Sequence, residues 1–505
     1  MKKILLYVTL CVFTLTSCND FLDVKPSNQL DISNTGQSIF TTDEARVMLT
    51  GIMRAMTSSD YYGRNFIMYG EAKGGFLTVP SQGRGLDALY TFNHSASTNS
   101  YSGYWLQIYF CILQANMLLN DIDKLIAAGN TDNLLLQYKA EVRTARAMFY
   151  YDLIRLYGKP YDMDKTSYGV PLTLDPLGYT AQPTRASVED VYVQILKDLT
   201  EDAEFLSKTK REGFISYYTN LAVQAKVYLQ MQNYDAALAA AEEIINSSLY
   251  KDKLYSNSEW VGSWTKQFGS ESIFELGIYP NEADLGTSSL GYYLRRKNHG
   301  GSAASGWFIA SKPFLDNLLG EDPDDVRWGV MDYDEKSSSR LGACYKYSGA
   351  VNKTSTGAGA TFVGDGKATA SAVNIKVIRL SEIYLIAAEA AFSKPSPDKE
   401  KAAGYLQEIR KRAPNLTPAD ENNITLDMIL NEKGKELFAE GQRYFDMIRL
   451  NKSITFDDAS IESGDVVIPT RPVTIDRTFY KTILPISLGE INANPAIKDQ
   501  QNPGY

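Results

Sequence analysis

The feature that most constrains the fold is a set of apolar stripes with helical spacing. In the segment 138–157, apolar residues recur every three or four positions, and Gly158 and Pro160 follow. This spacing lays one apolar face along a helix, and a glycine followed closely by a proline is typical of a helix end. The stripe consists of Val142, Ala145, Phe149, Leu153 and Leu156. The sequence therefore predicts an amphipathic helix that ends near residue 157.

Further stripes come in pairs. Residues 220–249 contain two stripes joined at Gln232-Asn233, and another pair covers 380–391 and 402–409. Alanines at facing positions let such helices approach closely, and the pattern resembles a tetratricopeptide unit, a helix pair of about 34 residues. Pairs of this kind bury their apolar faces only by stacking. Additional helices are predicted at 41–56, 101–128 and 426–437. We therefore expect a mostly α fold built on a tetratricopeptide-like helical-repeat scaffold.

The stretch from about 250 to 375 has a different texture. Gly, Ser, Tyr, Trp and Asn dominate it, and helical periodicity fades. We expect long loops with a few short strands laid on the scaffold, a type of region that often carries binding residues.

The N-terminus has the pattern of a targeting signal. Lys2 and Lys3 precede an apolar run over 4–15, which is too short to span a membrane. The run ends in Leu-Thr-Ser-Cys, which resembles the lipobox of bacterial lipoproteins. We therefore predict a lipoprotein signal peptide over 1–17, lipidation of Cys18, and a lipidated tether over 18–40. The acidic residues after Cys18 resemble the signal that exports lipoproteins to the cell surface, which places the anchored chain at the outer membrane, facing the exterior.

Charge and composition exclude several partners and chemistries. The 505 residues include 51 basic and 60 acidic side chains, a net charge of -9, so a nucleic acid partner is not expected. Two histidines, His94 and His299, and four cysteines leave few ligands for a metal cage. Cys111 and Cys344 are predicted to be two separate buried thiols, although a disulfide between them is also possible.

A search for catalytic motifs fails. The run 357–359 begins like a dinucleotide-binding fingerprint, but Phe362 stands where its last glycine belongs. The acidic run 321–325 lacks the glycine and the final glutamate of a calcium loop, and is predicted to be a solvated turn. Nothing local marks two carboxylates as an acid and a base. We predict no catalytic residue, no metal site and no cofactor.

Four segments in order along the chain carry a family resemblance. The third contains Glu-Leu-Phe-Ala-Glu-Gly-Gln-Arg-Tyr-Phe-Asp, and the last ends in Gln-Asn-Pro-Gly-Tyr. The segments are 18–23, 140–158 with Gly-Val-Pro-Leu at 169–172, 432–449 and 484–505. Together they resemble the SusD/RagB family of surface lipoproteins, which bind nutrients for a TonB-dependent outer-membrane transporter. In the second segment, the family's short turn from Gly to Pro is lengthened here by roughly ten residues.

The resemblance implies a helical core of about four tetratricopeptide-like units. It divides the chain into an N-terminal SusD-like region with helical repeats over 41–250 and a C-terminal SusD/RagB region over 251–505, irregular to about 375 and then helical. It also implies a glycan ligand, a SusC-like barrel as partner, and no enzyme activity. Six motif residues sit beside apolar stripes and are predicted to be scaffold charges: Arg146, Arg155, Glu440, Arg443, Asp446 and Arg449.

The family's ligand site is built from loops that correspond here to 60–101 and 286–308. No apolar stripe accounts for the aromatic residues of these loops. As ring platforms for a sugar we predict Tyr90, Tyr292 and Trp307. As polar contacts we predict Arg84, Asp87 and Asn93. The remaining tryptophans are predicted to pack internally: Trp105, Trp260, Trp264 and Trp328.

The leading hypothesis is capture of an oligosaccharide or polysaccharide at the cell surface and its transfer to the transporter. The main alternative is a peptide or glycopeptide ligand for the same kind of transporter. A glycoside hydrolase and a helical-repeat adaptor for other proteins remain two further alternatives.

Overall fold

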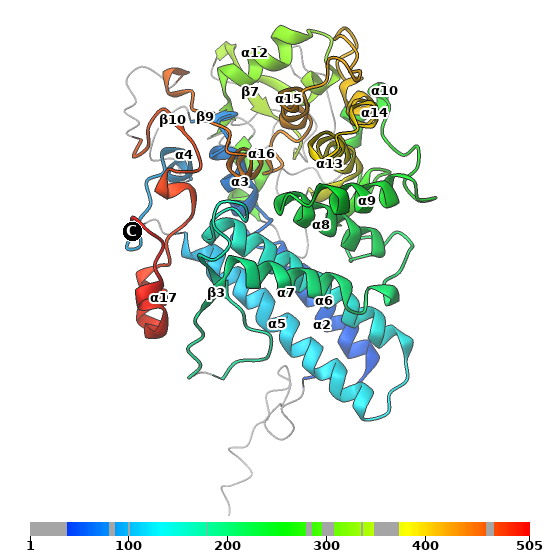
Figure 1. Cartoon of the computed structure of the whole chain (residues 1–505), viewed down its shortest axis with the longest axis vertical. Coiled ribbons are helices and arrows are strands. Elements are labelled where there is room, and N and C mark those ends of the chain that lie inside the picture. The colour runs from blue at the N-terminus through cyan, green and yellow to red at the C-terminus, as the bar shows by residue number, and fades with distance from the viewer. Residues whose placement is uncertain are drawn as a thin grey trace, which may run out of the picture.

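The computed structural model describes residues 38–79, 86–98, 101–178, 180–278, 285–294, 308–334, 337–347, 373–460 and 469–505. Helices dominate these residues, and Figure 1 shows long helices packed side by side below a more irregular upper part. The predicted signal peptide, Cys18 and most of the tether lie outside the described residues. The mostly α fold is confirmed.

The helices with their bounds are α2 Thr42–Met56, α3 Asn65–Ala72, α4 Asp87–Thr91, α5 Ser102–Ala127, α6 Asn133–Tyr157, α7 Val188–Thr200, α8 Tyr217–Gln230, α9 Tyr234–Ile245, α10 Asn257–Ser263, α11 Leu290–Leu294, α12 Lys312–Glu321, α13 Leu380–Ser393, α14 Lys399–Arg410, α15 Leu426–Glu436, α16 Arg443–Arg449 and α17 Leu488–Ala493. Among them, no helix is both long enough and apolar enough to cross a bilayer.

Local sequence explains the helix pair α8 and α9. Ser216 and Thr219 form a reciprocal capping box at the start of α8. Gln232 adopts a left-handed conformation, with φ of 59°, in the short turn between the helices, and Asn233 caps α9 with its side chain. The predicted junction at Gln232-Asn233 is therefore confirmed.

The scaffold grows by packing each helix on the next. Helix α6 packs against α5 and α7, α8 packs against α9, and α9 packs against α13 although a long irregular stretch separates the two. Ala237 and Ala241 of α9 and Ala387 of α13 are fully buried, and small residues of this kind let packed helices approach closely. An added methyl group there would cost about 1–3 kcal/mol through overpacking.

The stretch from 250 to 375 is more ordered than its composition predicts. The short strands expected there are present, and the helices α10 and α12, which the sequence did not predict, are present as well. The described strands pair two by two, all antiparallel, as β1 Leu77–Thr78 with β5 Ile309–Ala310, β2 Tyr168–Pro171 with β3 Arg185–Ser187, β4 Ser272–Leu276 with β8 Ile375–Arg379, β6 Met331–Asp334 with β7 Ser337–Cys344, and β9 Ile454–Thr455 with β10 Thr474–Ile475. Strand β8 leads directly into α13, so its pairing with β4 joins the irregular part to the scaffold.

The helical C-terminal region predicted beyond 375 ends earlier than expected. Helices run from α13 to α16, and the described residues after Arg449 are mostly irregular apart from α17. Buried Arg185 ties this tail to the scaffold by donating to the oxygen of Gly169 at 2.7 Å, to the oxygen of Tyr157 at 3.0 Å and to Oδ1 of Asn502 at 3.0 Å. Its partners are all neutral, and burial lowers the pKa of Arg185 to about 10.

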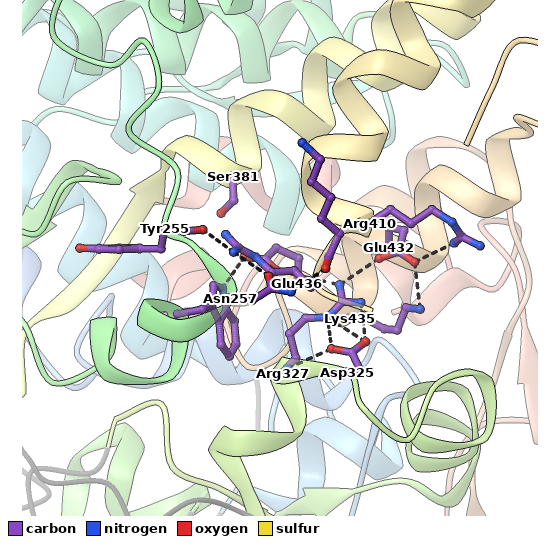
Figure 2. A network of polar contacts seen from close by, with 12 residues as sticks. Tyr255, Asn257, Asp325, Arg327, Ser381, Arg410, Glu432, Lys435 and Glu436 are labelled. Atoms are coloured by element: carbon purple, nitrogen blue, oxygen red, sulfur yellow. Dashed lines mark hydrogen bonds and ion pairs between the residues drawn. The ribbon is translucent and has the colours of Figure 1, made fainter. Parts of the chain in front are cut away.

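A buried network of charges joins the irregular part to α15. Figure 2 shows Arg327 between Asp325 and Glu432, with contacts of 2.6 Å and 3.0 Å. Glu436 accepts from the indole nitrogen of Trp260 at 3.0 Å and pairs with Arg379 at 3.2 Å. These side chains are almost completely buried, and buried charges of this kind persist only when they are paired.

The charged motif residues are scaffold, as predicted. Arg146 pairs with Asp198 at 2.7 Å, Glu440 pairs with Arg379 at 2.8 Å, and Arg449 pairs with Asp446 at 2.7 Å. Arg155 pairs with Asp152, which also accepts from Tyr62 at 2.7 Å.

Arg443 differs from the other motif charges. Its guanidinium lies 3.5 Å from the ring centroid of Phe76, and its Nε donates to the oxygen of Gly74 at 3.0 Å. The neighbouring Gly441 has φ of 79°, and a Cβ on Gly70 would lie 2.1 Å from its oxygen. The motif therefore carries glycine where α3 and the turn before α16 make close backbone contact.

The two cysteines and the tryptophans follow their predictions. Cys111 and Cys344 are both free and buried, and burial raises the pKa of Cys111 to about 12 and that of Cys344 to about 11. Trp105, Trp260, Trp264 and Trp328 are all buried.

Candidate functional site

The described part of the two predicted loops meets at the N-terminus of α3. The guanidinium of Arg64 lies over the ring of Tyr293 in α11, 4.7 Å from its centroid. Arg64 Nε donates to Oδ1 of Asn65 at 2.8 Å, and Asn65 Nδ2 donates to Oδ1 of Asp60 at 3.0 Å. We call Asp60, Arg64, Asn65, Tyr292 and Tyr293 the loop surface.

The loop surface is partly open to solvent. Asp60 is exposed, whereas Arg64 and Tyr292 are half-buried. The rings of Tyr292 and Tyr293 meet edge to face, with centroids 6.0 Å apart. Tyr293 and Asn65 are buried, so they hold the more open side chains in place. The arrangement combines accessible aromatic surface with fixed donors and acceptors.

Helix α5 supports this surface from beneath. The hydroxyl of Tyr104 donates to the backbone oxygen of Asn65 at 2.9 Å. A Cβ on Gly103 would lie 3.1 Å from the carboxylate carbon of Asp60, so Asp60 packs tightly against the first turn of α5. Tyr101, in the left-handed conformation with φ of 53°, precedes that turn, and its ring lies 5.8 Å from that of Tyr104.

Those predicted contact residues that the structure describes lie in different environments. Tyr292 lies on the loop surface, and Asn93 is exposed after the end of α4. Arg84 and Trp307 lie outside the described residues. Asp87 begins α4 and is buried, close enough to Tyr101 for its charge to help burial raise the pKa of that phenol.

The prediction that Tyr90 is a ring platform needs correction. Its side chain has 0% exposed surface, so its ring offers no face to a ligand in this structure. Its hydroxyl donates to Oδ1 of Asp458 at 2.8 Å, and the guanidinium of Arg471 lies 4.7 Å from its ring centroid. Tyr90 therefore anchors α4 to the C-terminal part of the chain.

Asp60 and Arg64 are not among the contact residues predicted from the sequence. Both belong to the polar loop that begins the predicted 60–101 segment, but that loop offers many polar residues of similar type. The signal that separates Arg64 from the others is its contact with Tyr293, far away in the sequence.

Two buried carboxyl groups outside the loop surface have raised pKa values. Burial raises the pKa of both Glu71 and Glu141 to about 7, a value suited to acid and base chemistry. Both carboxylates are completely enclosed, however, and Glu71 accepts from the backbone nitrogen of Gly441 at 2.7 Å. Among the described residues, no group of three or more His, Cys, Asp or Glu side chains is placed to hold a metal ion.

Comparison with known proteins identifies the fold. A model described as SusD family matches residues 328–505, and another, described as starch-binding associating with outer membrane, matches residues 20–229. The chain superimposes on a SusD superfamily protein from Bacteroides thetaiotaomicron with a TM-score of 0.80 and 30% identity, covering 92% of this chain and 100% of that one. The helical scaffold with its irregular part is thus the fold of the SusD superfamily.

Two more relatives cover nearly the whole chain. A putative sugar binding protein from Bacteroides vulgatus has a TM-score of 0.79 and 29% identity, over 93% of this chain and 100% of that one. The starch-binding protein SusD of Bacteroides thetaiotaomicron is 23% identical, over 97% of this chain and 96% of its own. The chain belongs to the SusD/RagB family.

Proposed function

We propose that this protein binds an oligosaccharide or polysaccharide at the cell surface and delivers it to a SusC-like, TonB-dependent outer-membrane transporter. The observation that carries the proposal is the loop surface, in which Tyr292 presents partly exposed aromatic surface beside Arg64 and Asp60. Sugars offer C–H faces that stack on rings, and hydroxyl rims that need both donors and acceptors. Two relatives reported above are described as starch-binding and sugar binding, which supports the same class of ligand.

In this account Tyr292 and Trp307 are the ring platforms. The backbone nitrogen of Phe308 donates to the oxygen of Tyr293 at 3.2 Å, so residue 308 adjoins the loop surface. Trp307 precedes it directly in the sequence. Arg64, Asp60, Arg84 and Asn93 supply polar contacts, and no covalent chemistry takes place.

Glycan titration of the soluble chain 19–505 tests the site. Maltoheptaose and laminariheptaose are suitable first probes, and a peptide pool at the same concentrations tests the alternative ligand class. We expect a glycan to bind, and its affinity to fall at least about tenfold in the double variant Tyr292→Ala and Trp307→Ala, because each ring lost from stacking costs on the order of 1 kcal/mol. Phe205→Ala, an exposed aromatic on another part of the scaffold, is the matched control. Glycan affinity unchanged in the double variant would refute the site, and binding of peptides alone would refute the ligand class.

The lipid anchor is part of the proposal. The described chain begins at Ser38, whose backbone nitrogen donates to Oδ2 of Asp121 in α5 at 2.6 Å, so the tether joins the scaffold at a fixed point. Metabolic labelling with a fatty acid should mark the full-length protein and not its Cys18→Ala variant. Equal labelling of the two would contradict the assignment of Cys18.

A further inference from the structure

A second recess lies away from the loop surface. Helix α5, the connection between β2 and β3, and α17 enclose a cavity of about 330 Å³. Figure 1 shows α17 and the β2–β3 connection on the same side of the N-terminal half of α5. We call this cavity and its rim the α5 groove. Its volume is at the lower end of the range for ligand pockets.

The walls of the α5 groove are apolar and continue onto open surface. Leu106, Phe110 and Leu113 stand at i, i+4 and i+7 on α5 and are 63%, 50% and 38% exposed. Leu106 and Leu113 line the cavity, and Leu177 of the β2–β3 connection, 46% exposed, lines it as well. An apolar helical stripe normally faces the core, and a contiguous exposed one marks a surface that meets another molecule.

The floor of the α5 groove is rigid. The rings of Trp105 and Tyr109 lie with centroids 4.8 Å apart, and the hydroxyl of Tyr109 donates to the backbone oxygen of Pro171 at 2.8 Å. Trp105 also packs edge to face on Tyr157, at 5.0 Å. The recess is therefore shaped before any partner arrives, which lowers the entropic cost of filling it.

A buried acceptor in the wall lacks a partner. Asn494, just after α17, is 6% exposed, and its Nδ2 donates to the oxygen of Pro183 at 2.8 Å. Its Oδ1 is buried and has no hydrogen-bond partner among the residues that the structure describes. An unpaired buried acceptor costs about 1–3 kcal/mol, which a donor from an incoming molecule would recover.

The charged side chains that line the recess have one sign. Among the described residues in its lining, they are the acids Asp175 and Glu490. Burial raises the pKa of Glu490, although a hydrogen bond from Trp105 opposes the shift. A basic side chain on a partner would relieve the desolvation of this carboxylate.

We propose that the α5 groove is a docking site for an extended segment of another protein, one that carries large apolar side chains flanked by a basic residue. The apolar side chains fill the recess over Trp105 and lie along Leu106 and Leu113, a donor of the segment reaches Oδ1 of Asn494, and the basic residue faces Asp175 and Glu490. The exposed stripe extends beyond the cavity, which favours a polypeptide over a small free molecule, and the acidic rim disfavours an anionic lipid surface.

Titration of the soluble chain 19–505 with defined peptides tests the proposal. The probe is acetyl-Gly-Lys-Leu-Phe-Lys-Gly-amide, and the comparison peptides replace both lysines by glutamate or the Leu-Phe pair by Ser-Asn. The readout is the indole N–H signal of Trp105 in an NMR spectrum of tryptophan-labelled protein, assigned with Trp105→Phe. We expect the lysine peptide to shift this signal with a dissociation constant on the order of 1 mM, and both comparison peptides to bind at least about fivefold more weakly.

Two variants decide between docking and chance association. Leu106→Ser with Leu113→Ser removes apolar area from the rim and should weaken the probe about tenfold. Val193→Ser, which removes an equally exposed apolar side chain on α7, should leave the affinity unchanged. Equal affinity for all three peptides, an unaffected double variant, or a Trp105 signal that moves with phosphatidylcholine vesicles and not with peptide would each overturn the proposal. Glycan titration of the same double variant keeps this result separate, because we expect glycan affinity to be unchanged.

Discussion

The protein keeps charged side chains in two very different surroundings. In the charge network of Figure 2, arginines and glutamates from η4 (Val326–Val330), β8 and α15 meet inside the molecule and leave almost no charge in contact with water. On the loop surface, Arg64 lies over the ring of Tyr293 and donates to the side-chain amide of Asn65, while Asp60 is exposed. Glu432 and Glu436 of the network lie in the family motif 432–449, whereas the residues of the loop surface lie outside the four motif segments.

The difference separates stability from recognition. A buried charge whose partner is removed stays desolvated, so changes in the network should alter the free energy of unfolding strongly. A half-exposed charge returns to water when its partner is lost, so changes on the loop surface should alter ligand affinity and leave stability nearly constant.

Removing the central arginine of the network should have the largest effect. Arg379 donates to both carboxylate oxygens of Glu440, each at 2.8 Å, and pairs with Glu436 and Glu271. In Arg379→Met these carboxylates keep their burial and lose their main counter-charge, so we expect the free energy of unfolding to fall by about 3–5 kcal/mol. Urea unfolding followed by circular dichroism measures the change.

An exposed ion pair provides the control for that variant. Lys312 and Asp316 pair on α12 with 69% and 62% of their side chains exposed. Lys312→Met should change the free energy of unfolding by less than about 0.5 kcal/mol. Similar losses in Arg379→Met and Lys312→Met would contradict the distinction between the two regions.

The pH dependence of stability should reflect buried carboxylates whose pKa values are shifted in opposite directions. Burial raises the pKa of Glu71 from 4.5 to about 7, so the folded state binds its proton more tightly, and Glu71 adds stability as the pH falls from 7 to 4.5. The neighbouring cations hold the pKa of Glu436 at about 2, so Glu436 loses its stabilising effect as the pH falls from 4.5 towards 2. The free energy of unfolding, measured across this pH range, should therefore be greatest near pH 4.5.

Glu71→Gln isolates the upper part of that curve. Glutamine keeps an acceptor for the backbone nitrogen of Gly441 and has no charge to bury. We expect this variant to be more stable than the natural protein at pH 7 by about 1–3 kcal/mol, and the two to converge by pH 4.5. A variant that is less stable at pH 7 would show that the Glu71 carboxylate is needed as a charge.

A buried lysine should give a smaller effect of the same kind. Lys73 is fully buried, and its Nζ lies 3.6 Å from the ring centroid of Phe92 and has no hydrogen-bond partner within the described part of the chain. Burial, with Lys481 and Arg471 nearby, holds its pKa well below the usual range, so the unfolded state binds its proton more tightly and stability rises with pH towards 10.5.

Lys73→Met keeps the stem and removes the amine. It should stabilise the protein at pH 7 by about 1 kcal/mol, and its advantage should shrink at pH 9.5. A constant difference between pH 7 and pH 9.5 would show that Lys73 does not titrate in this range.

The scaffold could be predicted from sequence because its signals are local. Helices α5, α6, α8 and α9 carry apolar stripes several turns long, with caps or glycine at their ends. Helix α12 was not predicted because it buries only Phe314 and Leu318, which are too few apolar residues to produce a recognisable helical period.

The loop surface could be predicted only in part because its contacts are made between distant segments. Tyr90 and Tyr292 occupy similar polar stretches, yet Tyr90 is enclosed by Asp458 and Arg471 while Tyr292 stays half-open. The aromatic residues of the two loops suggested ring platforms for a sugar, but many tyrosines of this chain pack in the core with their hydroxyls bonded internally. Fully buried examples are Tyr61, Tyr69, Tyr104, Tyr150 and Tyr250.

The most direct test of the account measures binding and stability in one variant of the loop surface. Arg64→Ala removes the guanidinium that lies between Tyr293 and Asn65, without leaving a buried charge unpaired. We expect glycan affinity in a calorimetric titration to fall by about tenfold, and the free energy of unfolding to change by less than about 1 kcal/mol. Unchanged glycan affinity, or a loss of stability as large as that of Arg379→Met, would contradict the division between a closed scaffold and an open binding surface.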